Sequence, residues 1–356
     1  MSLGKSNANV SRFRWLTRSL SVFGLVVIGL ILYGKTQEVD VLQGLSAHIN
    51  DRLQQPQQVE SVAISTSVVA IGAAVVSGQL AHPALTEASG LAISTRDQDV
   101  LFAINDSGNE PRLFALDHTG KDLGTWLIDG VDNIDWEDLA SFELDNKHYL
   151  LIADTGDNMR WRSTMHLYMV ETPDLAATSK EASLPVAWQV EFQFEHGPRD
   201  SEAIAVDVSG MQVLLLAKRV IPPQVYRLPL KPDSTQQRTR HIARQIGVVS
   251  LPRPTNEDLR QDPLFGQYRS QPTAMDINGN RLVILTYKDA WLFTRLVGQD
   301  WSSALQQVPG RITLPSIHQQ EAVALGDQGR RLWFTGEQAS SKDATPLMVV
   351  ELLGAQ

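Results

Sequence analysis

The sequence predicts an all-β fold, a β-propeller of four-stranded blades with an apolar N-terminal helix ahead of it. Three observations support this prediction. After residue 60, short runs rich in Val, Ile, Leu, Phe and Tyr alternate with Gly, Asn, Asp and Pro. Four such runs recur as a unit, and no long amphipathic helix interrupts them. The chain before residue 35 is different, because it is basic and then apolar.

Five copies of the repeating unit are recognisable, each opening with an acidic residue or its substitute and a short strand. These openings lie at residues 87–92, 137–140, 202–205, 273–276 and 321–324. An apolar strand ending in polar residues follows each opening, and two more strands precede the next copy. We therefore expect five blades, with six as the alternative, and we interpret residues 252–272 as an insert.

The last copy lacks a fourth strand of its own before the chain stops. Residues 66–78 are rich in Val and Ala and are predicted to supply it from the N-terminal side, which would leave no open edge in the ring. The alternative is a second membrane helix over residues 62–78, which would return the body of the protein to the cytoplasm.

An apolar stretch near the N-terminus predicts a membrane span. Residues 1–15 form a basic tail, and residues 16–34 are long and apolar enough to cross a bilayer core as a helix. Because the basic flank comes first, we expect a single-pass inner-membrane protein with its propeller in the periplasm. A cleaved signal peptide is the alternative, although residues 30–35 lack the small-residue pair of a cleavage site.

The stretch between this span and the propeller is polar. Apolar residues recur at helical spacing within residues 35–60, which predicts a short amphipathic helix followed by a linker, or alternatively a simple spacer. The propeller itself is then expected to occupy residues 61–356.

Composition narrows the possible functions. The 356 residues include no cysteine, which excludes disulfides, thiolate zinc sites and a cysteine nucleophile. All 40 acidic residues lie after residue 35, so the body is more acidic than the net charge of −9 for the whole chain indicates. A body this acidic excludes nucleic-acid binding and favours cations or cationic partners.

Acidic residues are predicted to converge at one end of the propeller channel. The first strand of each unit begins where the second, antiparallel to it, ends, so the residues at these two positions share a face. The candidate metal ligands there are Glu87, Asp106, Asp135, Glu137, Asp154, Asp157, Asp200, Glu202, Glu321 and Glu337. Many carboxylates in a small space need a cation or bound protons, and oxygen ligands favour Ca²⁺ or Mg²⁺. We expect Ca²⁺, held chiefly by Glu137, Asp154, Asp157 and Glu202.

The other side of the same ring is predicted to be basic. Lys218, Arg219, Tyr287 and Lys288 close second strands and are candidates for binding an anionic small molecule. His196 and His318 each precede a strand-opening Glu and are candidate general bases. The alternative for each carboxylate is a structural role, because Asp and Asn next to Gly also form turns and cap backbone N–H groups.

Several of these motifs resemble those of a known family. The sequence is similar to exported bacterial phytase-like, or esterase-like-phytase, proteins with a TolB-like propeller, over about residues 80–340. The similarity rests on motifs that begin at Glu87, Asn105, Asp135, Asp154, Asp200 and Gln320. The resemblance implies export, a propeller that is commonly six-bladed, and hydrolysis of a phosphoester or ester with calcium.

The predicted function is therefore that of a membrane-anchored periplasmic propeller that binds a divalent cation at its channel mouth. Hydrolysis of a phosphorylated or esterified small molecule is the expected reaction if the protein is an enzyme. The alternative is a non-enzymatic interaction platform in a cell-envelope protein complex, because propellers also serve as binding surfaces.

Overall fold

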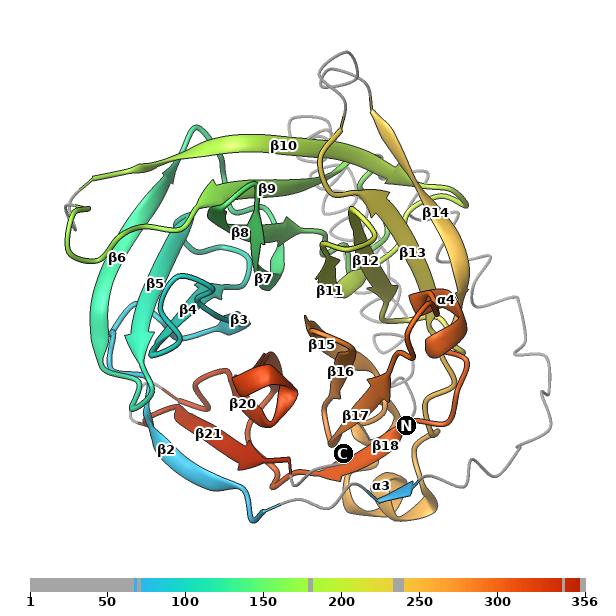
Figure 1. Ribbon diagram of the computed structural model, residues 1–356. Helices are drawn as coiled ribbons and strands as arrows, with labels where there is room; N and C mark the ends of the chain where they lie inside the picture. Colours follow the sequence, from blue (N-terminus) through green and yellow to red (C-terminus); the bar gives the residue numbers. More distant parts are fainter. Residues whose placement is uncertain (1–66, 69–71, 179–181, 233–239, 341–342, 353–356) are drawn as a thin grey trace, which may run out of the picture.

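The computed structural model describes residues 67–68, 72–178, 182–232, 240–340 and 343–352. The predicted all-β class is confirmed. Nearly all regular structure in the described chain is strand, arranged as four-stranded sheets in which each strand pairs antiparallel with the next. Figure 1 shows these sheets arranged around a common centre, which is a propeller-like architecture.

Five sheet units follow one another along the chain. The first contains β3 (Ala88–Ile93), β4 (Val100–Asn105), β5 (Arg112–Asp117) and β6 (Asp122–Asp129). The second contains β7 (Trp136–Leu144), β8 (Lys147–Asp154), β9 (Met165–Glu171) and β10 (Leu184–Phe194). The third contains β11 (Ser201–Asp207), β12 (Gln212–Ala217), β13 (Gln224–Pro229) and β14 (His241–Val248). The fourth contains β15 (Pro272–Asn278), β16 (Arg281–Thr286), β17 (Asp289–Thr294) and β18 (Gly310–Thr313).

The fifth unit is built from both ends of the described chain. Strands β19 (Gln320–Gly326), β20 (Arg331–Gly336) and β21 (Pro346–Glu351) are followed in space by β2 (Val75–Gln79), which pairs antiparallel with β21. The N-terminal strand therefore completes the last unit, as the sequence predicted (Figure 1). A membrane helix over residues 62–78 is wrong, because Val75–Gln79 is a strand.

The hydrophobic core lies between neighbouring units. Buried side chains alternate along each strand, so that Phe102 and Ile104 of β4 pack toward the second unit while Leu101 and Ala103 pack toward the fifth. A separate cluster of buried residues fills each of the interfaces between consecutive units, including the one between the fifth and the first. The first strands of the units contact each other in turn around the centre, and β19 contacts β3.

Outer strands link units at the rim. β10 pairs in parallel with β14 through Phe192–Phe194 and with β6 through Leu184 and Pro185. β1 (Ser67–Val68) pairs in parallel with β18. These pairings cover strand edges that would otherwise be open.

The predicted insert forms a small helical segment on the fourth unit. It contains α3 (Asn256–Gln261), which begins with a capping box between Thr255 and Asp258, and the 3₁₀ turn η1 (Gly266–Tyr268). The short helix α4 (Trp301–Ala304) and the 3₁₀ turn η2 (Asp327–Gly329) connect strands elsewhere.

The predicted location in the inner membrane is contradicted. No helix in the described part of the chain is long and apolar enough to cross a membrane, and the longest one there, α3, has 6 residues where a span needs about 20. The predictions for residues 1–15, 16–34 and 35–60 fall outside the described residues.

Candidate functional site

A β-bulge at the start of every inner strand sets the geometry of the site. The strand register shifts by one residue at the same place in all five units. The extra residues at these bulges are Ser89, Glu137, Glu202, Thr273 and Glu321. A bulge re-aims the side chain of its extra residue, so one backbone position per unit faces the end of the ring where the inner strands begin. We call this end the acidic mouth.

The extra residue of the bulge is a hydroxyl residue in two units and a glutamate in the other three. Ser89 Oγ donates a hydrogen bond to the carbonyl oxygen of Trp136 in the next unit, at 2.8 Å. Thr273 Oγ1 does the same to the carbonyl oxygen of Gln320, at 2.9 Å. In these two units a hydroxyl ties neighbouring inner strands together, whereas the remaining three units place a buried carboxylate at the mouth.

One carboxylate cluster makes no close ion pair within the described residues, although the charges of Arg162 and Lys218 act on it from farther away. Oxygen atoms of Asp106, Asp135 and Glu137 lie within 4.8 Å of one another. The carboxyl of Asp106 hydrogen-bonds that of Asp135, which requires one of the two to hold a proton. Burial, and then the charge of Asp106, raise the pKa of Asp135 to about 8. Burial, and then the charge of Glu202, raise the pKa of Glu137 well above its usual range. A hard cation would replace these protons and be held by oxygen ligands alone.

A neighbouring cluster has its charge balanced by the protein itself. Glu137, Asp200 and Glu202 also place oxygens within 4.8 Å of one another. Asp200 Oδ2 lies 2.5 Å from Nε of Arg219, and Glu202 pairs with Lys218. Since these two acids already have cations, the cluster of Asp106, Asp135 and Glu137 is the better fit for a metal ion.

Gly156 allows this arrangement to form. It follows β8, and a Cβ atom on it would lie 2.0 Å from Oε1 of Glu137 and 2.5 Å from Oδ2 of Asp135. Its backbone N–H donates to the carbonyl oxygen of Asp135 at 3.1 Å. Only glycine lets the backbone approach the two carboxylates this closely.

Two predicted metal ligands are instead held by protein groups. Asp154 Oδ1 lies 2.7 Å from Nη1 of Arg162, and both side chains are buried. Asp157 accepts hydrogen bonds from the backbone N–H groups of Trp161 and Arg162, at 2.8 and 2.9 Å. Burial raises the pKa of Asp157 to about 6 despite these donors. Both residues therefore order the loop after β8 beside the mouth.

A chain of hydrogen bonds crosses the mouth from the third unit to the fifth. Lys218 Nζ donates to the hydroxyl of Tyr287 at 2.8 Å, and that hydroxyl donates to Glu321. Burial raises the pKa of Glu321 to about 8, although the Lys218 charge opposes the shift. Glu337 hydrogen-bonds Glu321, and the more exposed Glu87 accepts from Asn109 Nδ2 at 2.6 Å. Lys218 and Arg219 thus lie directly beside predicted acidic residues and not across the ring from them.

A pocket of about 710 Å³ adjoins this chain of hydrogen bonds. Three of the four predicted anion-binding residues, Lys218, Arg219 and Tyr287, line it, and so does the exposed His318. The insert supplies another wall through Phe265, Tyr268 and Arg269. The volume lies within the range of roughly 300–1,000 Å³ found for small-molecule sites.

The other two predicted residues lie elsewhere. Lys288 pairs with the insert, where its Nζ lies 2.6 Å from Oδ1 of Asp258. His196 is exposed in the turn after β10 and does not line this pocket.

Asp138 is a central residue that the sequence analysis did not single out. It is fully buried next to Glu137, and its carboxylate accepts hydrogen bonds from the backbone N–H groups of Leu139, Ile204 and Met275. These donors belong to inner strands of three different units. Burial raises the pKa of Asp138 well above its usual range, while the three donors oppose that shift. The sequence does carry a sign of this role. At the strand position of Asp138, directly after the bulge, the other four units have a small residue.

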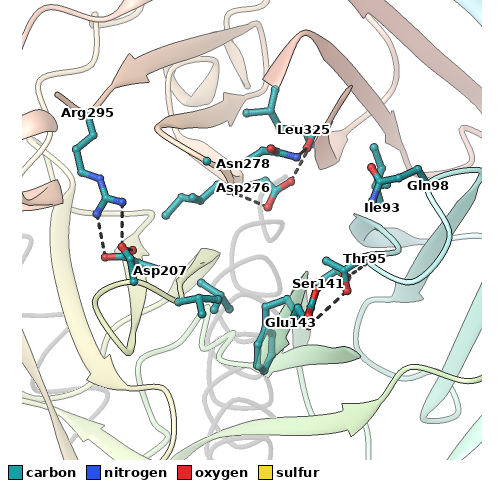
Figure 2. Close-up of a pocket in the computed structure, with 16 residues that line it drawn as sticks. Ile93, Thr95, Gln98, Ser141, Glu143, Asp207, Asp276, Asn278, Arg295 and Leu325 are labelled. Atoms are coloured by element: carbon teal, nitrogen blue, oxygen red, sulfur yellow. Dashed lines mark hydrogen bonds and ion pairs between the residues drawn. The ribbon is translucent and has the colours of Figure 1, made fainter. Parts of the chain in front are cut away.

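The opposite end of the ring carries a second pocket, of about 370 Å³ (Figure 2). The ends of the inner strands line it, including Asp276, whose carboxylate accepts from the backbone N–H of Leu325 at 2.8 Å. Arg295 lies 3.2 Å from Oδ2 of Asp207 on its wall. The polar side chains drawn in Figure 2 are largely bonded to one another or to backbone, so this pocket presents few free groups to a ligand.

Fold and site together define an all-β, propeller-like protein with buried carboxylates at one end of its ring. No family model and no curated protein matches the chain, so nothing among them supports the predicted phytase-like or TolB-like family. Its similarity to solved structures is distant. A luciferin-regenerating enzyme aligns with a TM-score of 0.40 and 9% identity, over 79% of this chain and 96% of that one.

Two further structures align at a similar level. A nidogen/laminin complex aligns with a TM-score of 0.38 and 13% identity, over 76% of this chain and 87% of that one. The major allergen Mala s 1 of Malassezia sympodialis aligns with a TM-score of 0.48 and 12% identity, over 81% of this chain and 99% of that one. Likenesses this weak carry no argument about function, so the proposals below rest on the residues of the site.

Proposed function

We propose that the acidic mouth binds Ca²⁺ and that the adjoining pocket holds an anionic ester, which the site hydrolyses. The observation that carries the proposal is the cluster of Asp106, Asp135 and Glu137, with oxygens within 4.8 Å of one another. Burial and neighbouring carboxylates raise the pKa values of Asp135 and Glu137, so a divalent cation would relieve this cluster, and its donors are all oxygens, as Ca²⁺ prefers.

The residues around the mouth have complementary tasks in this proposal. A bound Ca²⁺ would neutralise the carboxylates and polarise an oxygen of the substrate. Arg219 and Lys218 line the pocket and would bind the anionic group of the ester. Tyr287, hydrogen-bonded to Glu321, lies on the same wall and would donate a proton to the leaving oxygen as the ester bond breaks. An ionised carboxylate of the acidic mouth would take up the proton that the attacking water loses.

Calcium-dependent thermal melting of the full chain tests the metal site. Occupancy at a hundred times the dissociation constant stabilises a protein by about 2.7 kcal/mol, which corresponds to a rise in Tm of roughly 4 °C for a chain of this length. We expect this rise to disappear with EDTA and in Glu137→Gln. Glu143→Gln is the matched control, because Glu143 is exposed near the far end of the same strand. A Ca²⁺ effect that Glu137→Gln leaves intact would contradict the proposal.

Exposed apolar residues on the insert favour a second candidate function, that of a protein-binding platform. Leu264 and Phe265 are 72% and 64% exposed at the rim of the pocket, and Leu259 is 43% exposed. Hydrolysis of p-nitrophenyl phosphate or acetate that requires Ca²⁺ and Glu137 would favour the enzyme. A stoichiometric protein partner that Leu264→Ser releases and Glu137→Gln retains would favour the platform.

A further inference from the structure

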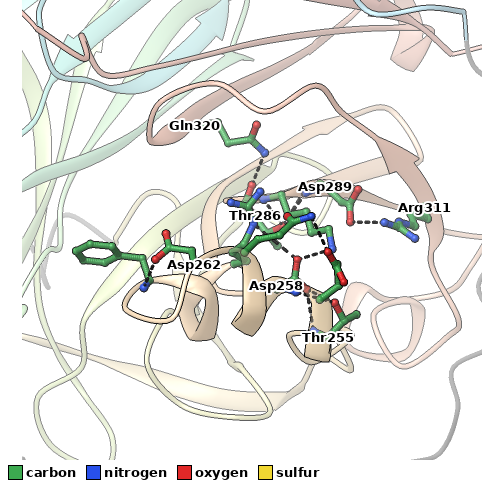
Figure 3. Close-up of polar contacts among 12 residues, drawn as sticks. Thr255, Asp258, Asp262, Thr286, Asp289, Arg311 and Gln320 are labelled. Carbon is green, nitrogen blue, oxygen red and sulfur yellow. Dashed lines mark hydrogen bonds and ion pairs between the residues drawn. The ribbon is translucent and has the colours of Figure 1, made fainter.

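A small cavity with an excess of positive charge lies between the insert and the fourth unit, apart from the acidic mouth. Its volume is about 160 Å³. The charged side chains that line it are Arg253, Arg269, Lys288, Arg311, Asp258 and Asp289. Four cations therefore accompany two carboxylates, and Figure 3 shows Asp289 beside its partner Arg311.

Each of the two acids already pairs with a cation, and Oδ1 of Asp289 is buried without a hydrogen-bond partner within the described chain. Asp258 Oδ1 lies 2.6 Å from Nζ of Lys288, and its other oxygen accepts from Thr255. These hydrogen bonds outweigh the effect of burial and lower the pKa of Asp258 to about 2, so it stays ionised. Asp289 Oδ2 lies 2.9 Å from Nη2 of Arg311. With both acids paired, a net charge of two remains on the cavity wall.

Two of the arginines have buried N–H donors without acceptors. Nε of Arg269 lies 3.8 Å from Oδ1 of Asp258, too far for a hydrogen bond, and is buried without a partner within the described chain. Nε of Arg311 is likewise buried without an acceptor there. Arg253 has no carboxylate partner among the described residues. A buried N–H group that lacks an acceptor is unfavourable, and a bound anion would supply the missing acceptor.

We propose that this cavity binds a small tetrahedral oxyanion of the inorganic phosphate or sulfate class. Two negative charges match the surplus on the wall, and tetrahedral oxygens suit guanidinium donors that approach from different elements. The size argues against a larger ligand, because 160 Å³ is below the roughly 300 Å³ at which drug-sized sites begin.

The anion would also hold one wall of the 710 Å³ pocket in place. Arg269 lines both cavities, and it follows the turn η1, whose Tyr268 lines the larger pocket. An oxyanion bonded to Arg269 would hold this wall of the insert against the fourth unit. The inference goes beyond the proposed calcium-dependent activity, since it concerns a site that contains none of the mouth carboxylates.

Isothermal titration of the full chain with phosphate, in Ca²⁺-free buffer and against chloride at matched ionic strength, tests the proposal. We expect saturable one-to-one binding that Arg253→Gln and Arg269→Gln each weaken at least tenfold. Arg253 is exposed and unpaired with any described acid, so its replacement tests binding without a folding defect. Arg260→Gln is the matched control, because Arg260 lies on α3 but outside the cavity and pairs with Glu257.

Tryptophan fluorescence gives an independent reading, because Trp291 lines the cavity and Arg311 lies over its ring at 5.9 Å. A phosphate-induced signal that Trp291→Phe removes would support the assignment. Absence of saturable binding would overturn it, as would equal weakening by Arg260→Gln. Binding that Arg219→Gln abolishes and Arg253→Gln retains would place the anion in the larger pocket and also overturn it. Glu137→Gln should bind phosphate normally, which separates this result from any failure of the calcium site.

Discussion

One backbone position decides the chemistry of each unit. The extra residue of the inner-strand bulge is a hydroxyl at Ser89 and Thr273, and each hydroxyl bonds the next unit. The same position is a buried glutamate at Glu137, Glu202 and Glu321. A glutamate at this position places its carboxylate at the mouth, whereas a serine or threonine bonds the neighbouring inner strand. One residue therefore decides whether a unit adds an acid to the mouth, and its strands stay the same.

Gly156 provides a test of the metal cluster that leaves every charge in place. Gly156→Ala would put a methyl group where the carboxylates of Glu137 and Asp135 now lie. We expect it to weaken Ca²⁺ binding at least tenfold in isothermal titration, because the ligands must move apart. Gly72→Ala is the control, since a Cβ there meets only ordinary contacts, the nearest at 3.5 Å. Unchanged Ca²⁺ binding in Gly156→Ala would exclude this cluster as the site.

The raised pKa values of the mouth predict a distinctive pH dependence. Asp135 and Glu321, with pKa values of about 8, hold protons in the folded protein that the unfolded chain releases near pH 4. The metal-free protein should therefore lose stability as the pH rises from about 4 to about 8. Ca²⁺ needs deprotonated ligands, so its stabilising effect should grow over the same window. Urea unfolding at several pH values, with EDTA or Ca²⁺, measures both trends, and metal-free stability that rises with pH would contradict the assignment.

At the scale of elements, β2 acts as the connection between the fifth unit and the first. It pairs with β21 on one side, while its Gln79 N–H donates to the carbonyl oxygen of Thr119 in the first unit at 3.1 Å. A Cβ atom on Gly78 would lie 1.9 Å from that same carbonyl oxygen. The strand therefore depends on a glycine where two backbones meet.

Substitution of this glycine should weaken the whole fold. We expect Gly78→Ala to lower the free energy of unfolding by roughly 1–3 kcal/mol, because a backbone must move to accept the methyl group. Gly247→Ala is a matched change in β14, where a Cβ meets only the end of the Gln306 side chain at 4.0 Å. Equal stability of the two variants in urea unfolding would show that β2 does not hold the first and fifth units together.

The sequence predicted most of the elements because the units repeat. Spacing located the inner strands, the insert and the N-terminal strand that completes the last unit. It could not show which side chains meet. Asp154 and Asp157 follow a second strand, as expected of mouth residues, yet Arg162 and nearby backbone N–H groups engage them. The repeat pattern places Lys288 at the end of a second strand, where a side chain was expected to face the mouth. Lys288 instead forms an ion pair with Asp258 of the insert.

At the scale of the whole molecule, the ring has two chemically different ends. The end where inner strands begin gathers buried carboxyls beside a large pocket. The opposite end has a smaller pocket whose polar groups are largely bonded within the protein (Figure 2). Asp138 lies between them and joins inner strands of three units. This asymmetry is why we direct both the calcium test and the hydrolysis test to the acidic mouth.

The pairing of β2 with β21 also has a consequence for how the protein is made. A ribosome synthesises β2 early and β21 much later, with roughly 15–50 s between them at 5–20 residues per second. Throughout that interval the nascent chain carries a strand whose partner does not yet exist, and Val75 and Val76 have no sheet to join. Earlier units can fold as they emerge, but the ring stays open during translation. We therefore expect the ring to close late, when β21 pairs with a β2 that has stayed free.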